Sequence, residues 1–361
     1  MTVAIVALSG RALAAAARRA GERCCVVDCF ADEDTRALAQ RCIRVDGALA
    51  HGFTAALLRG ALSGRDISGI VYGAGFEADP ALLAILAETA PVLGNPPEIV
   101  AAVKDPTRLA ATLAALGLPH PQTRLAPPEH GEGWLSKRVG GSGGVHIRRA
   151  GAVAPGRYYQ REVAGRPVSV LFVADGRRAR TIGFSAQWCD ATPEQPFRYG
   201  GCVTPAGLGM RLEAVLAEAC DAIVRATGLV GLNSLDLLVA GEGFHVIEIN
   251  PRPGATLDIF DGSGALKLWP LHLAGIRGLL PRAPRAPAGG RAASLVYAPR
   301  PLTVPPGFAW PDWAADRSSA GSVMASGDPV CTVLAPAATA QNAEQTVRER
   351  ARRILAALGA I

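Results

Sequence analysis

Two short strand patterns near the middle of the chain carry oxygen-bearing side chains. In "LDLLVAGEGFHVIEIN", apolar and polar residues alternate. This spacing puts Asp236 on the polar face of the first strand, and Glu248 and Asn250 on the polar face of the second. Three oxygen ligands suit Mg²⁺ or Mn²⁺ better than zinc. The pattern therefore predicts a metal site on a β-hairpin.

The pairing of these carboxylates depends on the hairpin turn. "GEG" at 241–243 predicts a three-residue loop in which Ala240 pairs with Phe244. Asp236 then lies directly opposite Glu248. Two facing carboxylates repel each other, and a bound cation removes that penalty. The alternative is a pair of solvent-exposed carboxylates on an open sheet face.

A lysine and a glycine-rich run make up a second stretch, "WLSKRVGGSGGVHIRR" at 134–149. As part of a strand, Lys137 shares a face with Leu135 and Val139, where an ammonium is unfavourable unless an anion meets it. The run that follows offers backbone N–H groups to phosphate oxygens. Its residues are Gly140, Gly141, Ser142, Gly143 and Gly144. The alternative is a flexible hairpin whose lysine reaches water.

The order of this stretch differs from that of a P-loop. In a P-loop the lysine follows the glycines and a helix begins there. Here the lysine comes first, and 145–147 predict a strand. The sequence therefore indicates another kind of phosphate site.

Alternating patterns divide the 361 residues into regions. Strand and helix patterns alternate up to about residue 95, which predicts a small parallel α/β domain. Short strands and one amphipathic helix, 210–228, predict an α+β region between about 120 and 250. "RAPRAPAGGRAA" at 282–293 predicts a linker. Further short strands and a final helix at about 343–358 follow it.

Composition excludes several classes of protein. The net charge of +6 comes from scattered arginines, without the basic block or aromatic interleaving typical of nucleic-acid binding. Neither a secretory signal nor a membrane span is predicted, so we expect a cytoplasmic protein. The eight cysteines include no CxxC pair, which predicts reduced and mostly buried thiols.

Together these stretches resemble the ATP-grasp superfamily of carboxylate–amine ligases, across nearly the whole chain. "LSKRVGGSGG" resembles its mobile glycine loop, and "LDLLV" with "IEINPRPG" resembles its magnesium-binding strands. The resemblance implies an ATP-grasp fold of α/β and α+β parts. The implied regions are a Rossmann-like pre-grasp domain (1–95), a lid subdomain (96–165), a large subdomain with the magnesium site (166–281), and a linker with a C-terminal β-rich module and final helix (282–361).

The resemblance also implies roles for residues. Lys104, in "VKDPTRLAATLAALGLPHPQT", and Lys137 would contact the nucleotide, and Arg252 would act with Lys137 in catalysis. "YYQREVAG" resembles the hinge that reads adenine, through Gln160, Arg161, Glu162 and Val163. Asp236, Glu248 and Asn250 would hold the metal.

This sequence departs from the pattern of the superfamily at two positions. Many relatives carry a ribose-binding Glu near Pro167, which leaves the ribose contact unassigned, with Glu162 as a substitute. Many carry Glu where Gln160 stands, although a neutral amide still hydrogen-bonds adenine.

The reaction implied is ATP-dependent joining of a carboxylate to an amine through an acylphosphate, with ADP and phosphate released. The cofactors implied are ATP and Mg²⁺ or Mn²⁺, and the partners are a small carboxylate and a small amine. Homodimers are common for this architecture, so a homodimer is suggested by analogy alone. The alternatives are a carboxyphosphate-using carboxylase and a catalytically silent ATP-binding regulator.

The substrates are addressed by fewer residues. In the segment 185–205, Trp188, Arg198 and Tyr199 are candidates for the acceptor side, and Asp258 is a candidate for binding an amine. The alternative for this segment is an ordinary surface loop. The opening "SGRALAAAARRAG" with "VVDCFADEDTR" also resembles ligases of methanopterin and methylofuran biosynthesis, including tyramine–glutamate ligases, which implies glutamate or an aromatic amine as substrate.

Overall fold

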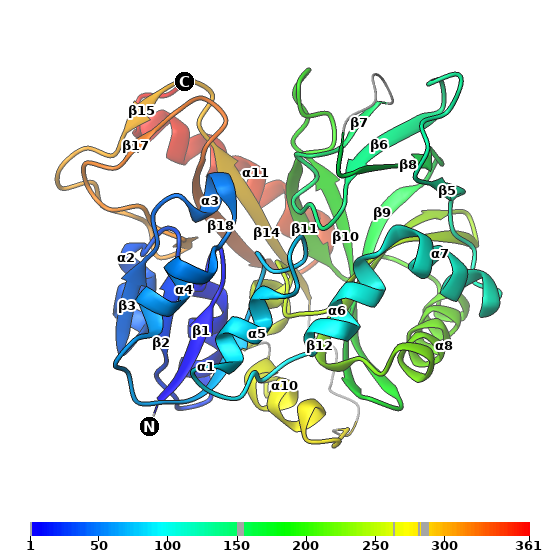
Figure 1. The fold of residues 1–361 in the computed structure, drawn as a ribbon. Coiled ribbons are helices and arrows are strands. Elements are labelled where there is room, and N and C mark those ends of the chain that lie inside the picture. Colours follow the sequence, from blue (N-terminus) through cyan, green and yellow to red (C-terminus); the bar gives the residue numbers. More distant parts are fainter. Residues whose placement is uncertain (1, 150–154, 263, 281, 283–288) are drawn as a thin grey trace.

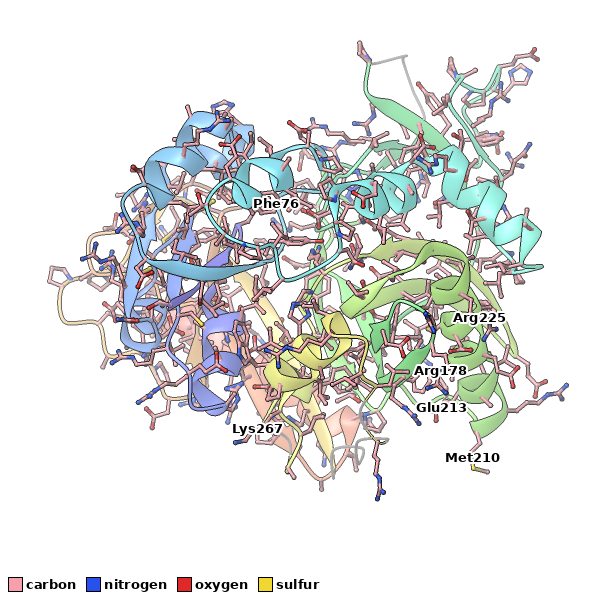
Figure 2. The ribbon with its side chains drawn as sticks, turned by 60° about the horizontal axis from the view of Figure 1, so that its bottom comes forward. Phe76, Arg178, Met210, Glu213, Arg225 and Lys267 are labelled. Atoms are coloured by element: carbon pink, nitrogen blue, oxygen red, sulfur yellow. The ribbon has the colours of Figure 1, made fainter. Side chains whose placement is uncertain are left out.

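A computed structural model describes residues 2–149, 155–262, 264–280, 282 and 289–361. Figure 1 shows the N-terminal sheet at the lower left, the lid strands at the upper right, and the larger sheet extending from the right across the middle of the molecule. Figure 2 shows Met210, Glu213 and Arg225 along α8 (Met210–Thr227) at the outer edge of the larger part, away from Phe76. No helix in the described part of the chain is both long and apolar enough to cross a bilayer.

The N-terminal sheet is parallel, as the alternating patterns predict, with the order β3-β2-β1-β4. Its strands are β1 (Thr2–Val6), β2 (Cys25–Asp28), β3 (Arg41–Arg44) and β4 (Ile67–Tyr72). The helices between and after them are α1 (Arg11–Arg19), α2 (Glu33–Leu38), α3 (Ala48–His51), α4 (Ala55–Leu62) and α5 (Leu82–Ala87). Gly21 follows α1 with a φ of 92°, which only glycine adopts readily, and this conformation ends the helix.

The lid sheet is antiparallel and has the order β5-β8-β6-β7. Its strands are β5 (Thr123–Arg124), β6 (Trp134–Arg138), β7 (Arg148–Arg149) and β8 (Arg157–Arg161). Two helices precede it, α6 (Pro97–Lys104) and α7 (Pro106–Ala115), and the Asp105 side chain caps the second. The strand predicted at 145–147 is wrong. Gly143 and Gly144 turn the chain with φ near 66° and 71°, so β7 begins only at Arg148.

The large sheet has eight strands in the order β13-β12-β9-β10-β11-β14-β18-β16. Its strands are β9 (Arg166–Asp175), β10 (Ala179–Cys189), β11 (Tyr199–Thr204), β12 (Val230–Ala240), β13 (Gly243–Asn250), β14 (Gly290–Tyr297), β16 (Ala314–Ala315) and β18 (Pro329–Ala337). The remaining elements are α9 (Leu257–Phe260), α10 (Leu268–Ile276), β15 (Leu302–Thr303), β17 (Val323–Met324) and α11 (Ala340–Ala357).

The C-terminal strands continue this sheet, because β14 pairs with both β11 and β18. The linker predicted at 282–293 is therefore too long. Its residues 283–288 lie outside the described residues, but Gly290 already begins β14, where Ala292 and Ala293 are buried. The final helix begins at Ala340, earlier than expected, because the Thr339 hydroxyl caps it at the N–H of Asn342.

Most cysteines pack as small apolar side chains. All eight are free thiols, and Cys189 is the exposed one. Burial raises the pKa of the Cys24 thiol to about 12, which keeps it protonated and unreactive.

Candidate functional site

The hairpin of the predicted metal site pairs Asp236 with Glu248, as expected, but through a different turn. Ala240 pairs with Gly243, so the loop has two residues and the expected Ala240–Phe244 pairing is wrong. A bulge between Asp236 and Leu237 shifts the register and brings the two carboxylates opposite each other again. The turn is tight because Gly241 adopts a φ of 58°.

The three predicted metal ligands form one hydrogen-bonded cluster with Lys104. The Lys104 ammonium donates to a Glu248 carboxylate oxygen, and to the Asn250 amide oxygen at 3.1 Å. The Asn250 amide donates to Asp236 at 2.8 Å, and the Ser169 hydroxyl donates to the other Asp236 oxygen at 2.6 Å. A protein cation thus lies against the carboxylates.

Charge explains the titration of this cluster. Burial and the facing Glu248 raise the pKa of Asp236 to about 6. Burial also favours the neutral form of Glu248, but the Lys104 ammonium outweighs it and lowers the pKa of that carboxyl. The pair therefore needs positive charge nearby to stay fully ionised.

An oxygen-liganded cation fits this cluster. Two carboxylates and one amide oxygen are the donors that Mg²⁺ prefers. Over the part of the chain that the structure describes, no three His, Cys, Asp or Glu side chains gather as metal ligands. The Lys104 ammonium shows that the carboxylates accept a cation at this place.

Lys137 is buried, as the strand pattern predicts, and faces the same cluster. Its ammonium donates to the Gln160 side-chain oxygen at 2.6 Å. Burial lowers the pKa of Lys137 to about 8, although Glu248 and Asp236 oppose that shift. The lid lysine and the hairpin carboxylates therefore interact within one site, although they come from different sheets. Lys104 and Lys137 are also two of the three lysines in a chain that otherwise uses arginine.

The glycine loop lies closed against two other parts of the molecule. A Cβ on Gly140 would approach the Ala78 backbone to 2.4 Å, and a Cβ on Gly144 would lie 1.8 Å from the Phe197 carbonyl oxygen. The Gly143 carbonyl accepts a hydrogen bond from the Tyr199 N–H at 2.9 Å. Glycines at these positions therefore allow close contact that side chains would prevent.

His146, which follows the glycines, was missed from the sequence. Its Nδ1 accepts the Arg138 N–H at 3.1 Å, and a Cβ on Gly141 would meet its ring at 2.4 Å. Burial lowers the pKa of His146 to about 4, so the ring is neutral at physiological pH. Its position eight residues after Arg138 gave no local signal, because only the folded loop brings the two together.

Arg252 is held by the N-terminal domain. Its Nε donates to Glu77 at 2.7 Å, and the other Glu77 oxygen accepts the N–H groups of Gly75 and Phe76. Burial favours neutral Glu77, but the charges of Arg252 and Lys104 lower its pKa to about 2. Glu77 was missed because 175 residues separate it from Arg252.

The backbone before Arg252 is also clamped. The Pro251 carbonyl accepts from the Tyr72 hydroxyl at 3.1 Å and from the Asn95 amide at 2.9 Å. Asn95 also donates to Asn233 at 2.8 Å. These contacts fix the segment that follows β13 against the N-terminal domain.

The predicted hinge is divided by the structure. Gln160 is buried beside Lys137, whereas the Arg161 guanidinium lies over the Trp134 ring, 5.6 Å from its centre. The backbone N–H groups of Arg161 and Glu162 already donate to Gln122 and Gly133. The Val163 backbone is therefore the stronger candidate in this segment for reading a base edge.

A cavity of about 380 Å³ lies beside Arg252 and the glycine loop. Tyr199, Asp258 and Arg252 line it, together with Ser142 and Gly143 of the lid. Asp258 binds Arg11 through both oxygens, at 2.5 and 2.6 Å. The candidate amine-binding residue is thus engaged by an arginine of the first domain.

Two other substrate candidates lie outside this cavity. Trp188 packs under the Arg348 guanidinium, 4.7 Å from the ring centre. Arg198 pairs with Asp190 at 2.5 Å and lies over the Tyr297 ring at 3.9 Å. Both line a separate surface depression beside α11. The structure thus places Tyr199 and Asp258 at the cavity, and Trp188 and Arg198 at the separate depression.

The fold and this cluster define a class of protein. Residues 103–256 match the family described as the ATP-grasp domain. The chain carries an ATP-grasp domain and has the ATP-grasp fold, as the sequence predicts.

Solved structures extend the likeness to nearly the whole chain. Biotin carboxylase of Campylobacter jejuni, in a β-γ-ATP complex, has a TM-score of 0.73 at 15% identity, over 96% of this chain and 90% of that one. The biotin carboxylase domain of Hydrogenobacter thermophilus 2-oxoglutarate carboxylase, a dimer with MgADP and bicarbonate, has a TM-score of 0.73 at 12% identity over 97% and 90%. N5-carboxyaminoimidazole ribonucleotide synthetase of Thermotoga maritima has a TM-score of 0.67 at 14% identity over 98% of both.

A curated relative is similar in sequence as well. The carbamoyl phosphate synthase large chain of Myxococcus xanthus is 25% identical over 193 residues, which cover 46% of this chain. The match spans only 18% of that relative's length. These likenesses establish the fold, and the particular reaction is addressed below.

Proposed function

We propose that this protein is an ATP-dependent ligase that joins a small carboxylate to a small amine through an acylphosphate. In this reaction the carboxylate attacks the γ-phosphate of ATP, ADP leaves, and the amine then displaces phosphate. Such chemistry needs positioned anions and compensated charge and no protein nucleophile. The Asp236–Glu248–Asn250–Lys104 cluster, inside an ATP-grasp domain, carries the proposal.

The same cluster supports placing the metal and the nucleotide in a cleft between the lid sheet and the hairpin. Asp236, Glu248 and Asn250 would hold Mg²⁺ or Mn²⁺, which supplies positive charge to the phosphates when bound. The relatives solved with β-γ-ATP and with MgADP support ATP and magnesium as the cofactors.

The chain's own cations have distinct positions in this proposal. Lys137 comes from the lid strand and Lys104 from the end of α6, so two ammonium groups approach the phosphates from different sides. Arg252 lies at the wall that the cleft shares with the cavity, held there by Glu77. Burial strengthens the interaction of each of these charged groups with phosphate, because little water screens it.

Lid closure would exclude water from the intermediate. An acylphosphate hydrolyses if water reaches it, and the glycine loop already packs on Phe197 and Ala78. The Gly141 N–H donates to the Arg138 carbonyl. The N–H groups of Gly140, Ser142, Gly143 and Gly144 have no acceptor among the described residues and would be available for phosphate oxygens. The same loop would therefore bind the phosphates and shield the acylphosphate from water.

Phosphate release from MgATP tests the proposal. Carboxylates and amines are supplied singly and in pairs, including glutamate, tyrosine and tyramine, the substrates suggested by the resemblance of the N-terminal stretch to cofactor-biosynthetic ligases. We expect release that requires both a carboxylate and an amine. Release with ATP and bicarbonate alone would contradict the ligase reaction and support a carboxylase, the activity named for two of the structural relatives.

A further inference from the structure

One carboxylate on the cavity wall has no partner. Asp32 precedes α2, is 5% exposed, and lines the cavity. In the part of the chain that the structure describes, its side chain accepts no hydrogen bond and forms no ion pair, and it does not cap α2. An isolated buried carboxylate is unfavourable unless it is neutral or meets a cation.

The neighbouring carboxylates are all engaged. Asp28 accepts the N–H groups of Gly10 and Ala31 at 3.0 and 2.7 Å. Asp34 accepts the N–H groups of Asp316 and Arg317, both at 2.9 Å. Asp32 therefore differs from the carboxylates around it in being free to bind something else.

The carboxylates on this wall outnumber the cationic side chain that pairs with them. Arg11 already binds Asp258 through two oxygens and Asp316 at 3.0 Å. Burial raises the pKa of Asp32 to about 8, and repulsion from Asp316, Asp28 and Asp34 adds to the shift. A cation that entered the cavity would relieve this repulsion and restore the ionised form.

The backbone is strained at the same place. Ala31 and Asp316 have φ values of 49° and 52°, and no other non-glycine residue in the described ranges has a positive φ. Ala31 directly precedes Asp32, and the Asp316 carboxylate accepts hydrogen bonds from Arg11. Such conformations are held at functional sites by the structure around them.

The rest of the cavity gives the shape of the ligand. Leu8, Phe30, Leu49, Leu295 and Val330 make much of the wall apolar. The cavity continues to Arg252 and to Ser142 in the lid, the parts assigned to the phosphate end. A ligand with an apolar body and one cationic group would fill it.

We propose that Asp32 binds the ammonium group of an amine substrate whose apolar body fills this cavity, with the Arg11–Asp258–Asp316 cluster as a fixed frame. The assignment of this cation to the amine substrate rests on the proposed ligase function. Binding of the cation itself does not require turnover, so the two proposals can fail separately.

Three probes of the same shape test the proposal by isothermal titration. They are phenethylamine, the neutral 2-phenylethanol and the anionic 3-phenylpropionate, each titrated at mildly alkaline pH with and without Mg²⁺ and a non-hydrolysable ATP analogue. We expect the amine to bind at least about tenfold more tightly than the alcohol, because only the amine meets the charge of Asp32.

Two variants remove one carboxylate each. Asp32→Asn should abolish the preference for the amine while the affinity for the ATP analogue stays unchanged. Glu33→Gln is the matched control, because Glu33 is the next residue and is exposed, and it should keep the preference.

The outcomes separate the two proposals. Equal or undetectable binding of the amine and the alcohol by the wild type, or a preference that survives Asp32→Asn, would overturn the cation site and leave Asp32 as a neutral carboxyl. Amine binding that depends on Asp32, without turnover of any substrate pair, would support the site and contradict the ligase.

Discussion

The molecule contains two acidic clusters that are built differently, one at the hairpin and one at the cavity wall. At the hairpin, Asp236 and Glu248 come from neighbouring strands and meet a protein ammonium, Lys104. At the cavity wall, the carboxylates come from distant segments, joined by Arg11 across 305 residues to Asp316. The first cluster is partly compensated, because Lys104 pairs with Glu248. In the second cluster Asp32 has no hydrogen-bond or ion-pair partner among the described residues.

This difference separates two roles. A metal ion bound at the hairpin would compete with Lys104 for Glu248, so this cluster has a cation partner with or without a metal. An uncompensated carboxylate instead waits for charge brought by a ligand. The hairpin thus suits a resident cofactor, and the cavity wall suits a substrate that comes and goes.

Glu248→Gln should have the largest effect, because it removes charge from the compensated cluster. We expect Mg²⁺-dependent phosphate release to fall by about 1,000-fold or more, with the fold retained. Glu242→Gln is the control, since Glu242 lies exposed in the turn of the same hairpin. Activity that survives Glu248→Gln would refute the metal assignment.

The hairpin cluster was predictable because its information is local. Period-two alternation put Asp236, Glu248 and Asn250 on one face. The predicted pairing of Asp236 with Glu248 is correct although the predicted turn is wrong, because the bulge offsets the one-residue error in the loop length. Glu77, Asn95 and the contacts of Arg11 were not predictable. Each depends on how the first domain packs on the grasp strands, and no periodicity within a segment encodes that packing.

Glu77 joins the two clusters, since it holds Arg252 between them. Its pKa is lowered from 4.5 to about 2, so its ion pair contributes stability above pH 4.5 that is lost as pH falls toward 2. We expect Glu77→Gln to lower the free energy of unfolding at neutral pH by about 3 kcal/mol.

Urea unfolding at several pH values checks this expectation. The gap between the wild type and Glu77→Gln should narrow as pH falls below about 4.5. Glu98→Gln, at an exposed position in the first turn of α6, should show no such gap. A gap that is constant with pH would mean that the glutamate acts by packing and not by charge.

Lys137→Ala should weaken binding of an ATP analogue by about 10- to 100-fold, because a buried charged donor to phosphate is lost. Titration calorimetry measures the affinity. Lys267→Ala is the control at the third lysine, which is exposed and lies by α10 at the molecule's edge (Figure 2). If both variants bind the analogue equally well, Lys137 does not belong to the nucleotide site.

Gly144→Ala should give the smallest change, about tenfold in kcat/KM for ATP, by obstructing the closed lid. The added Cβ would meet the Phe197 carbonyl oxygen at 1.8 Å, and the φ of 71° adds strain. Gly156→Ala separates these causes, since Gly156 has the same φ and nothing within 4 Å of its Cβ position. A loss shared by both variants would point to strain in the lid sheet. A loss confined to Gly144→Ala would show that contact between the lid and the segment before Tyr199 is needed for turnover, and would connect the phosphate end of the cleft to the cavity wall.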